Sequence, residues 1–134
     1  MLKRINHIAL IVPELESAKR FWVDVMGVPL DHEDHVAEQK VDVAFMSLEG
    51  TNIELLKPTD HESGVAKFLD KRGPGMHHIC FEVDDIETAL DELRRADVPL
   101  IDKIPRTGHG GKKYVFIHPK GTGGVLVELY QISA

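Results

Sequence analysis

Two stretches of this chain repeat one pattern. Near the start, His7 stands in the run Asn6-His7-Ile8-Ala9-Leu10, and 71 residues later His78 stands in His77-His78-Ile79-Cys80-Phe81. Each run leads to an amphipathic segment and then to a strand-like run with one acid, Ile53-Glu54-Leu55 or Val127-Glu128-Leu129. The separation from His to Glu is 47 residues in the first copy and 50 in the second. Such a repeat predicts two copies of one supersecondary unit, neither of which must bury its sheet alone.

The first copy has clear helix and turn signals. Apolar residues recur at helical spacing over residues 14–26, and Gly27 follows them as a stop. Ser63 is placed to cap a short helix that runs through Leu69. The polar stretch 31–40 is expected to form a loop or an exposed hairpin. Strands are expected over residues 5–12, 28–30, 41–48 and 52–56, with a tight turn at Glu49-Gly50.

The second copy has the same order of elements. Gly73-Pro74-Gly75 marks the boundary, so we expect a single domain, 1–134, built from repeats at about 1–72 and 76–134. Asp84 is the expected cap of a helix that runs through Leu93. Strands are expected over residues 79–83, 98–100, 114–117 and 125–130. Each copy is then β-α-β-β-β, and the fold class is α+β.

Composition excludes several kinds of function. The net charge of −6 argues against nucleic-acid binding through bulk charge, although a local basic patch for a small phosphorylated ligand is compatible with it. Cys80 is the sole cysteine, so an intramolecular disulfide cannot form and a reducing compartment is expected. The sequence has no long apolar stretch and no recognisable signal segment, so we expect a cytoplasmic protein that does not associate with membranes.

The repeated polar residues suggest a metal site. Glu54 and Glu128 each stand between two apolar residues, and His7 and His78 are each followed by an isoleucine; strand alternation points these apolar neighbours to the opposite face. Two acids in one cleft require a cation, because a buried unpaired carboxylate costs several kcal/mol. Two imidazoles with two carboxylates suit Co²⁺, Mn²⁺, Ni²⁺ or Zn²⁺ with open positions for water or substrate. We select His78 over His77 because His78 aligns with His7 when the two copies are superimposed in sequence.

Other reactive residue types receive simpler interpretations. The histidines at 32, 35, 61 and 109 lie in polar segments and are expected to be exposed. His118, which precedes Pro119, is expected to be structural. Cys80 is expected to be a packed thiol, since the sequence offers no activating partner. The glycines at 108–111 do not match a nucleotide-binding P-loop.

The chain resembles the vicinal oxygen chelate superfamily and, within it, the methylmalonyl-CoA epimerases. The resemblance covers nearly the whole chain. It implies paired β-α-β-β-β modules that form a half-barrel around a metal. The matching runs are His7-Ile8-Ala9, Glu38-Gln39-Lys40-Val41, Ile53-Glu54-Leu55-Leu56-Lys57-Pro58, the Ser-Gly-Val-Ala-Lys-Phe run at 63–68, Gly75-Met76-His77-His78-Ile79, His118-Pro119-Lys120 and Gly124-Val125-Leu126-Val127-Glu128-Leu129.

The resemblance also implies an activity. It predicts metal ligands at His7, Glu54, His78 and Glu128, cobalt as the most expected ion, an acyl-CoA substrate and a homodimer. The reaction would remove the α-proton of methylmalonyl-CoA and return it on the other face, through a metal-stabilised enediolate. Glu128 is the predicted base for one face. Some relatives carry a second acid where this chain has Val43, so the other base is left open between a loop acid such as Glu38 and a metal-bound water.

Two alternatives remain beside the epimerase. A glyoxalase I-like lyase acting on a hemithioacetal would use the same four ligands, but such chains tend to have an acidic turn where this one has His118-Pro119-Lys120. A non-catalytic binding protein of the same fold would lack the metal ligands, all four of which this chain keeps.

Overall fold

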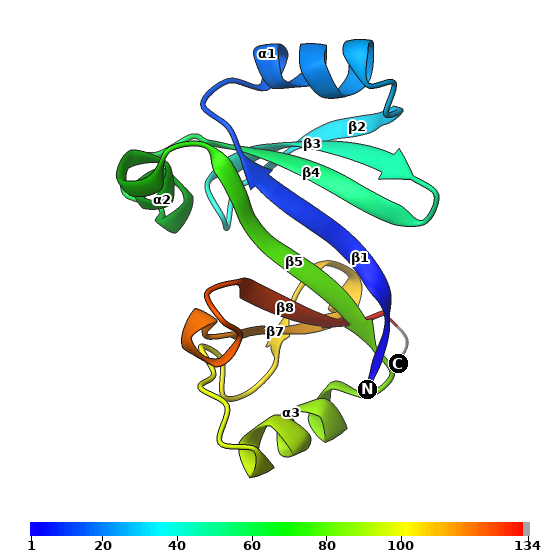
Figure 1. Ribbon diagram of the computed structural model, residues 1–134, viewed down its shortest axis with the longest axis vertical. Helices are drawn as coiled ribbons and strands as arrows, with labels where there is room; N and C mark the ends of the chain where they lie inside the picture. Colours follow the sequence, from blue (N-terminus) through cyan, green and yellow to red (C-terminus); the bar gives the residue numbers. More distant parts are fainter. Residues whose placement is uncertain (133–134) are drawn as a thin grey trace. The chain divides into compact units, whose positions relative to one another are not determined.

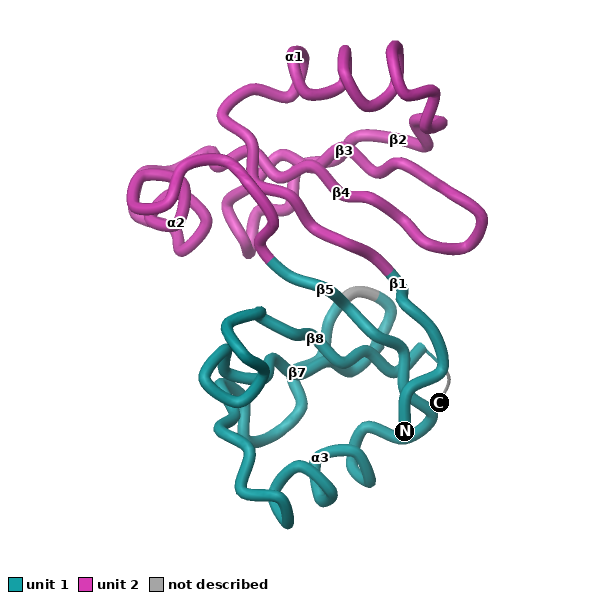
Figure 2. The backbone as a smooth tube through the Cα atoms, in the orientation of Figure 1, with its two compact units in different colours: residues 1–6, 78–134 teal, residues 7–77 magenta. Residues whose placement is uncertain are grey.

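The computed structural model describes residues 1–132, with the exception of the side chain of His109. The chain forms two compact units (Figure 2). Unit 2 contains residues 7–77, and unit 1 contains residues 1–6 together with residues 78–134. Strand β1 (Leu2–Ile11) begins in unit 1 and ends in unit 2, and β5 (Gly75–Val83) runs from unit 2 into unit 1. That the two units make up a single domain stays a prediction.

Unit 2 has the order of elements that the first copy predicts (Figure 1). Its sheet has the strand order β2-β3-β4-β1, in which β4 pairs antiparallel with β3 and parallel with β1. The predicted turn is confirmed, with positive φ at both Glu49 and Gly50. The elements between β1 and β5 are α1 (Leu15–Lys19), a π-helical segment (Arg20–Val25), β2 (Leu30–Val36), β3 (Val41–Leu48), β4 (Thr51–Pro58) and α2 (Gly64–Arg72).

Unit 1 repeats this topology, with the strand order β5-β8-β7-β6. Strand β8 pairs parallel with β5 and antiparallel with β7. The first residues of β1 belong to this unit, where Asn6 Nδ2 donates to Glu82 Oε2 at 2.9 Å. After β5 follow α3 (Ile86–Arg95), β6 (Arg106–Thr107), a 3₁₀ turn (His109–Gly111), β7 (Lys113–Ile117), a second 3₁₀ turn (Pro119–Gly121) and β8 (Leu126–Gln131). The α+β class is therefore confirmed.

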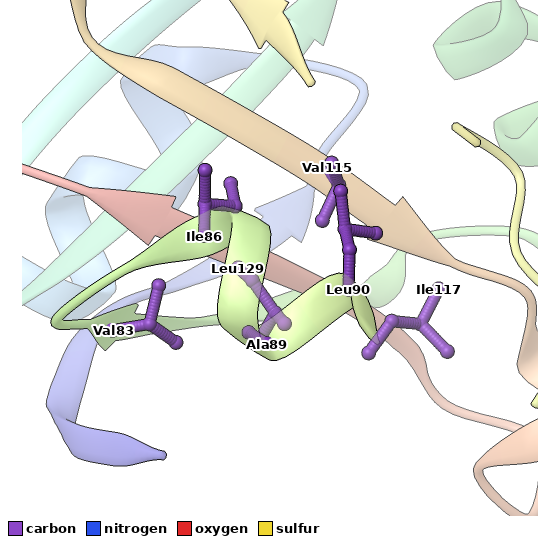
Figure 3. Close-up of a cluster of buried hydrophobic side chains, with 7 residues drawn as sticks. All are labelled: Val83, Ile86, Ala89, Leu90, Val115, Ile117 and Leu129. Atoms are coloured by element: carbon purple, nitrogen blue, oxygen red, sulfur yellow. The ribbon is translucent and has the colours of Figure 1, made fainter. Parts of the chain in front are cut away.

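The hydrophobic core follows strand alternation. In unit 1, buried side chains of α3 pack against those of β5, β7 and β8, as Figure 3 shows. In unit 2, Leu55 and Met46 face α1, while Leu56 and Val43 pack with residues of α2 on the other face of the sheet. The face shared by Ala9 and Ile11 is the α2 face, and Leu10 packs on the α1 face, as the alternation predicts.

Three local predictions need correction, and one open alternative is decided. The helix expected over 14–26 changes from α to π geometry at Arg20. Of the two alternatives for residues 31–40, the exposed hairpin is confirmed and the loop is wrong, because residues 31–36 belong to the edge strand β2, which pairs antiparallel with β3. The cap of α3 is Asp85 rather than Asp84: the Asp85 side chain accepts from Glu87 N, and Asp84 pairs with Lys3. The strand expected at 98–100 is reduced to a single bridge between Leu100 and Ile117.

The described helices include none that is both long and apolar enough to cross a membrane.

Candidate functional site

In unit 2, β1 and β4 bring His7 and Glu54 together. These parallel strands pair Ala9 with Glu54, so the acid lies diagonally across from His7, two residues away along the sheet face. His7 Nδ1 and Glu54 Oε2 are 3.2 Å apart. Their side chains are 12% and 15% exposed, so water screens the pair only weakly.

In unit 1, β5 and β8 build the same arrangement from His78 and Glu128. The register pairs Cys80 with Glu128, and the acid again lies diagonally across from the histidine. His78 Nε2 and Glu128 Oε1 are 3.2 Å apart, and the side chains are 9% and 12% exposed. His77 points elsewhere and packs edge-on against Phe68 in unit 2, with ring centroids 5.1 Å apart.

Each unit adds a phenylalanine that the sequence reasoning missed. Phe45 on β3 is the register partner of Glu54, and Phe116 on β7 is the register partner of Glu128. The Phe116 ring lies edge-on to His78, with centroids 5.5 Å apart. The two phenylalanines are 71 residues apart, the same offset as His7 and His78, and this offset was the available signal. They place apolar surface beside both carboxylates.

The two units differ beside the acid. Cys80 is fully buried, which confirms the expectation of a packed thiol. Its Sγ and a carboxylate oxygen of Glu128 lie within 4.8 Å of each other. At the equivalent position of unit 2, the register partner of Glu54 is Ala9. A polarisable thiol thus stands near one acid and a methyl group near the other.

The donor set of each unit fits a divalent metal ion. Each unit supplies one imidazole nitrogen and one carboxylate oxygen from adjacent strands. Neighbouring ligands on an ion with bond lengths of about 2.1 Å are about 3.0 Å apart. The 3.2 Å separations are close to that value. Nearly buried carboxylates also require a cationic or proton-donating partner.

The candidates for a second base lie in unit 2. Glu38 is exposed in the turn between β2 and β3. Val43 is buried in the cluster on the α2 face. Asp42, the neighbour of Val43 on β3, points to the other face by strand alternation, and its Oδ1 lies 2.8 Å from His35 Nδ1. His35 is exposed, as predicted, and so is His32, although its ring stacks on Phe45.

Comparison with known proteins identifies the family. Residues 6–116 match the model of the Glyoxalase/Bleomycin resistance protein/Dioxygenase superfamily. An ethylmalonyl-CoA/methylmalonyl-CoA epimerase from Cereibacter sphaeroides is 41% identical over 98% of this chain and 100% of its own length. The chain belongs to the methylmalonyl-CoA epimerase family of this superfamily.

Other members of the family are similar along nearly the whole chain. The mitochondrial methylmalonyl-CoA epimerase of Homo sapiens is 41% identical over 97% of this chain and 74% of its own length. A solved methylmalonyl-CoA epimerase in complex with methylmalonyl-CoA and NH4+ has a TM-score of 0.89 and 32% identity, covering 100% of this chain and 97% of that chain. The resemblance drawn from the sequence motifs is therefore confirmed.

Proposed function

We propose that this protein is a metal-dependent epimerase that interconverts (R)- and (S)-methylmalonyl-CoA. The observation that carries the proposal is the pairing of one His with one Glu in each unit, in a chain of the methylmalonyl-CoA epimerase family. Relatives named as epimerases of methylmalonyl-CoA, and of ethylmalonyl-CoA as well in one case, support this substrate class. A neighbour solved with methylmalonyl-CoA supports binding of the CoA thioester.

The proposed metal ligands are His7, Glu54, His78 and Glu128. Cobalt is the most expected ion, and Mn²⁺, Ni²⁺ and Zn²⁺ suit the same nitrogen and oxygen donors. What supports this set is the low exposure of all four side chains and the equal separation within each pair. The bound ion would supply positive charge where negative charge develops on the thioester oxygen.

Glu128 is the proposed base for one face of the substrate. Its carboxylate is nearly buried between the strands that carry Cys80 and Phe116, and His78 orients it. A carboxylate held in a water-poor place can take the α-proton without first shedding a hydration shell. Its conjugate acid can return the proton to the carbon.

The opposite face needs a second proton carrier. Of the candidates, we propose Glu38, because it is an exposed acid on the turn that enters β3, in the unit that carries His7 and Glu54. Val43 cannot perform this role, since its side chain is aliphatic and is packed against the α2 face. A single water molecule is the alternative carrier.

A homodimer and a cytoplasmic location are also proposed, and both rest on the family and on the sequence alone. Light scattering coupled to size-exclusion chromatography tests the first proposal. A mass of twice 15.0 kDa is expected, and a monomer mass contradicts it.

The epimerase and lyase functions are separated by presenting both substrates to one cobalt-loaded preparation. A single epimer of methylmalonyl-CoA should be converted to a mixture of both C2 epimers, and a glutathione hemithioacetal should remain unchanged. The opposite result would assign the site to glyoxalase chemistry. Failure with both substrates, while metal is bound, would contradict both enzyme functions.

A further inference from the structure

The positive charges of this acidic protein are unevenly distributed. The chain has a net charge of −6, but residues 103–127 contain five Lys or Arg residues and no Asp or Glu. These residues connect α3 to the strand that carries Glu128, entirely within unit 1. Locally concentrated positive charge attracts anionic ligands even when the whole protein repels them.

Arg106 is the positive side chain that unit 1 holds in place. Its Nε donates to Asp102 Oδ1 at 2.7 Å, and its guanidinium lies 6.0 Å from the centroid of the Tyr114 ring. Asp102 is itself nearly buried and accepts the backbone N–H of Phe116 at 2.9 Å. Asp102 and the sheet thus fix the direction of the Arg106 side chain. That side chain is 53% exposed, so its terminal NH₂ groups can reach a ligand in solvent.

The guanidinium is always charged, and this pairing favours the charged form further. The hydrogen bond from Arg106 to Asp102 raises the pKa of the guanidinium, and the Coulombic attraction of the carboxylate adds to that effect. The Asp102 carboxylate occupies the Nε edge of the guanidinium. The other donors can form charge-assisted hydrogen bonds to an anion.

Arg106 lies on the same face of the unit 1 sheet as Glu128. Arg106 is the register partner of Tyr114, which pairs with Tyr130, while the neighbouring row pairs Phe116 with Glu128. Directly opposed residues of a sheet share a face. Strand spacing of about 4.8 Å and a two-residue rise of about 6.7 Å place the two backbones about 12 Å apart.

We propose that Arg106, held by Asp102, binds a phosphate group of the coenzyme A portion of the substrate. This inference rests on the proposed function, which places the thioester oxygen at the metal near Glu128 and, with it, the reacting carbon and its carboxylate. The phosphates are the remaining anionic groups of the molecule, and the pantetheine arm carries them away from the reacting carbon. A fixed guanidinium matches phosphate oxygens through two parallel hydrogen bonds.

The test pairs a change in the protein with a change in the substrate. Arg106→Ala should raise KM for methylmalonyl-CoA about tenfold, the effect of losing one charge-assisted contact, and leave kcat unchanged. The same variant should turn over methylmalonyl-pantetheine, which lacks the nucleotide, with wild-type KM. Arg95→Ala on α3 is the matched control, since it removes the same charge without affecting either KM. Asp102→Asn should show the same KM pattern as Arg106→Ala, because it releases the guanidinium.

Calorimetry with coenzyme A itself makes the result independent of catalysis. Arg106→Ala should weaken coenzyme A binding about tenfold, also in a preparation that epimerises nothing, so failure of the proposed function is recognised separately. Loss of the effect with 3′-dephospho-coenzyme A would assign Arg106 to the 3′-phosphate, and persistence would assign it to the diphosphate. Equal losses with full and truncated substrates, or unchanged coenzyme A binding, would overturn the proposal. Arg106→Gln provides the same comparison if the alanine variant does not fold.

Discussion

Cys80 is the register partner of Glu128 on the neighbouring parallel strand, and its thiol is fully buried. Ala9 is the register partner of Glu54 in unit 2, so the thiol is one difference between the immediate surroundings of the two His–Glu pairs. Buried cysteines behave as small hydrophobic residues unless an activating partner lowers the pKa of the thiol.

Replacing this cysteine should therefore lower the free energy of unfolding and leave the rate of the reaction nearly unchanged. Cys80→Ala should keep the bound metal per chain and retain activity within a few-fold, while the free energy of unfolding falls by about 1 kcal/mol through the lost contacts. Metal analysis, initial rates and urea unfolding measure the three quantities. A hundredfold loss of activity in a folded, metal-loaded variant would show that the thiol takes part in the chemistry.

The proposed metal ligands predict that equivalent substitutions in the two units lower the affinity for metal equally. His7→Ala and His78→Ala should each weaken metal binding at least tenfold, because each removes one of the proposed nitrogen donors. His61→Ala, which changes an exposed loop residue, is the control and should bind metal normally. Competition with a chromophoric chelator measures the affinities. If one histidine variant retained wild-type affinity, that residue would not be a ligand.

The N-terminus of α3 predicts a pH-dependent contribution to stability. Hydrogen bonds from Thr88 and then from the backbone of Glu87 lower the pKa of Asp85 below its ordinary value of 3.8. The charged carboxylate therefore stabilises the fold above the unfolded value, and this stabilisation is lost as pH falls through the lower folded pKa.

Thermal unfolding of wild type and Asp85→Ala tests this linkage. The difference in Tm should be constant above about pH 5 and should shrink as the solution is acidified toward pH 2. Asp84→Ala is the control, since Asp84 pairs with Lys3 and does not cap the helix. A Tm difference for Asp85→Ala that stays the same down to pH 2 would refute the charge dependence of the cap.

The core of unit 1 predicts a large effect at Leu90. This side chain is fully buried among residues of α3, β7 and β8. Leu90→Ala should lower the free energy of unfolding by about 2–5 kcal/mol, through lost burial and the cavity that remains. Leu48→Ala, at a side chain that is 50% exposed, should change it by less than about 0.5 kcal/mol. Similar urea midpoints for the two variants would contradict this packing.

Strand alternation made much of the candidate site predictable from sequence. Glu54 and Glu128 each stand between two apolar residues and both histidines precede an isoleucine, and a period of two is a local property that the sequence displays directly. The repeat offset then distinguished His78 from His77. The same offset also marked Phe45 and Phe116, but their apolar character made them look like ordinary core residues.

The remaining features depend on context that the sequence does not display. Asp84 and Asp85 are equally good caps by residue type, and only the backbone path into α3 shows that Asp85 takes this position, while Asp84 pairs with the distant Lys3. Strand β2 is polar because it lies at the edge of its sheet, so its residues lack the alternation of a half-buried strand. The contact of Asp102 with both Arg106 and Phe116 joins separate strands, and tertiary structure creates it.

The most direct test of the central claim is deuterium exchange at C2 of methylmalonyl-CoA, followed by NMR in deuterated buffer. The cobalt-loaded protein should exchange the α-proton rapidly, and removal of the metal by a chelator should abolish the exchange, which added Co²⁺ then restores. Glu128→Gln, loaded with the same ion, should exchange it about 10²–10⁴-fold more slowly. Exchange that persists at the full rate in the stripped protein, or in the Glu128→Gln variant, would contradict the account.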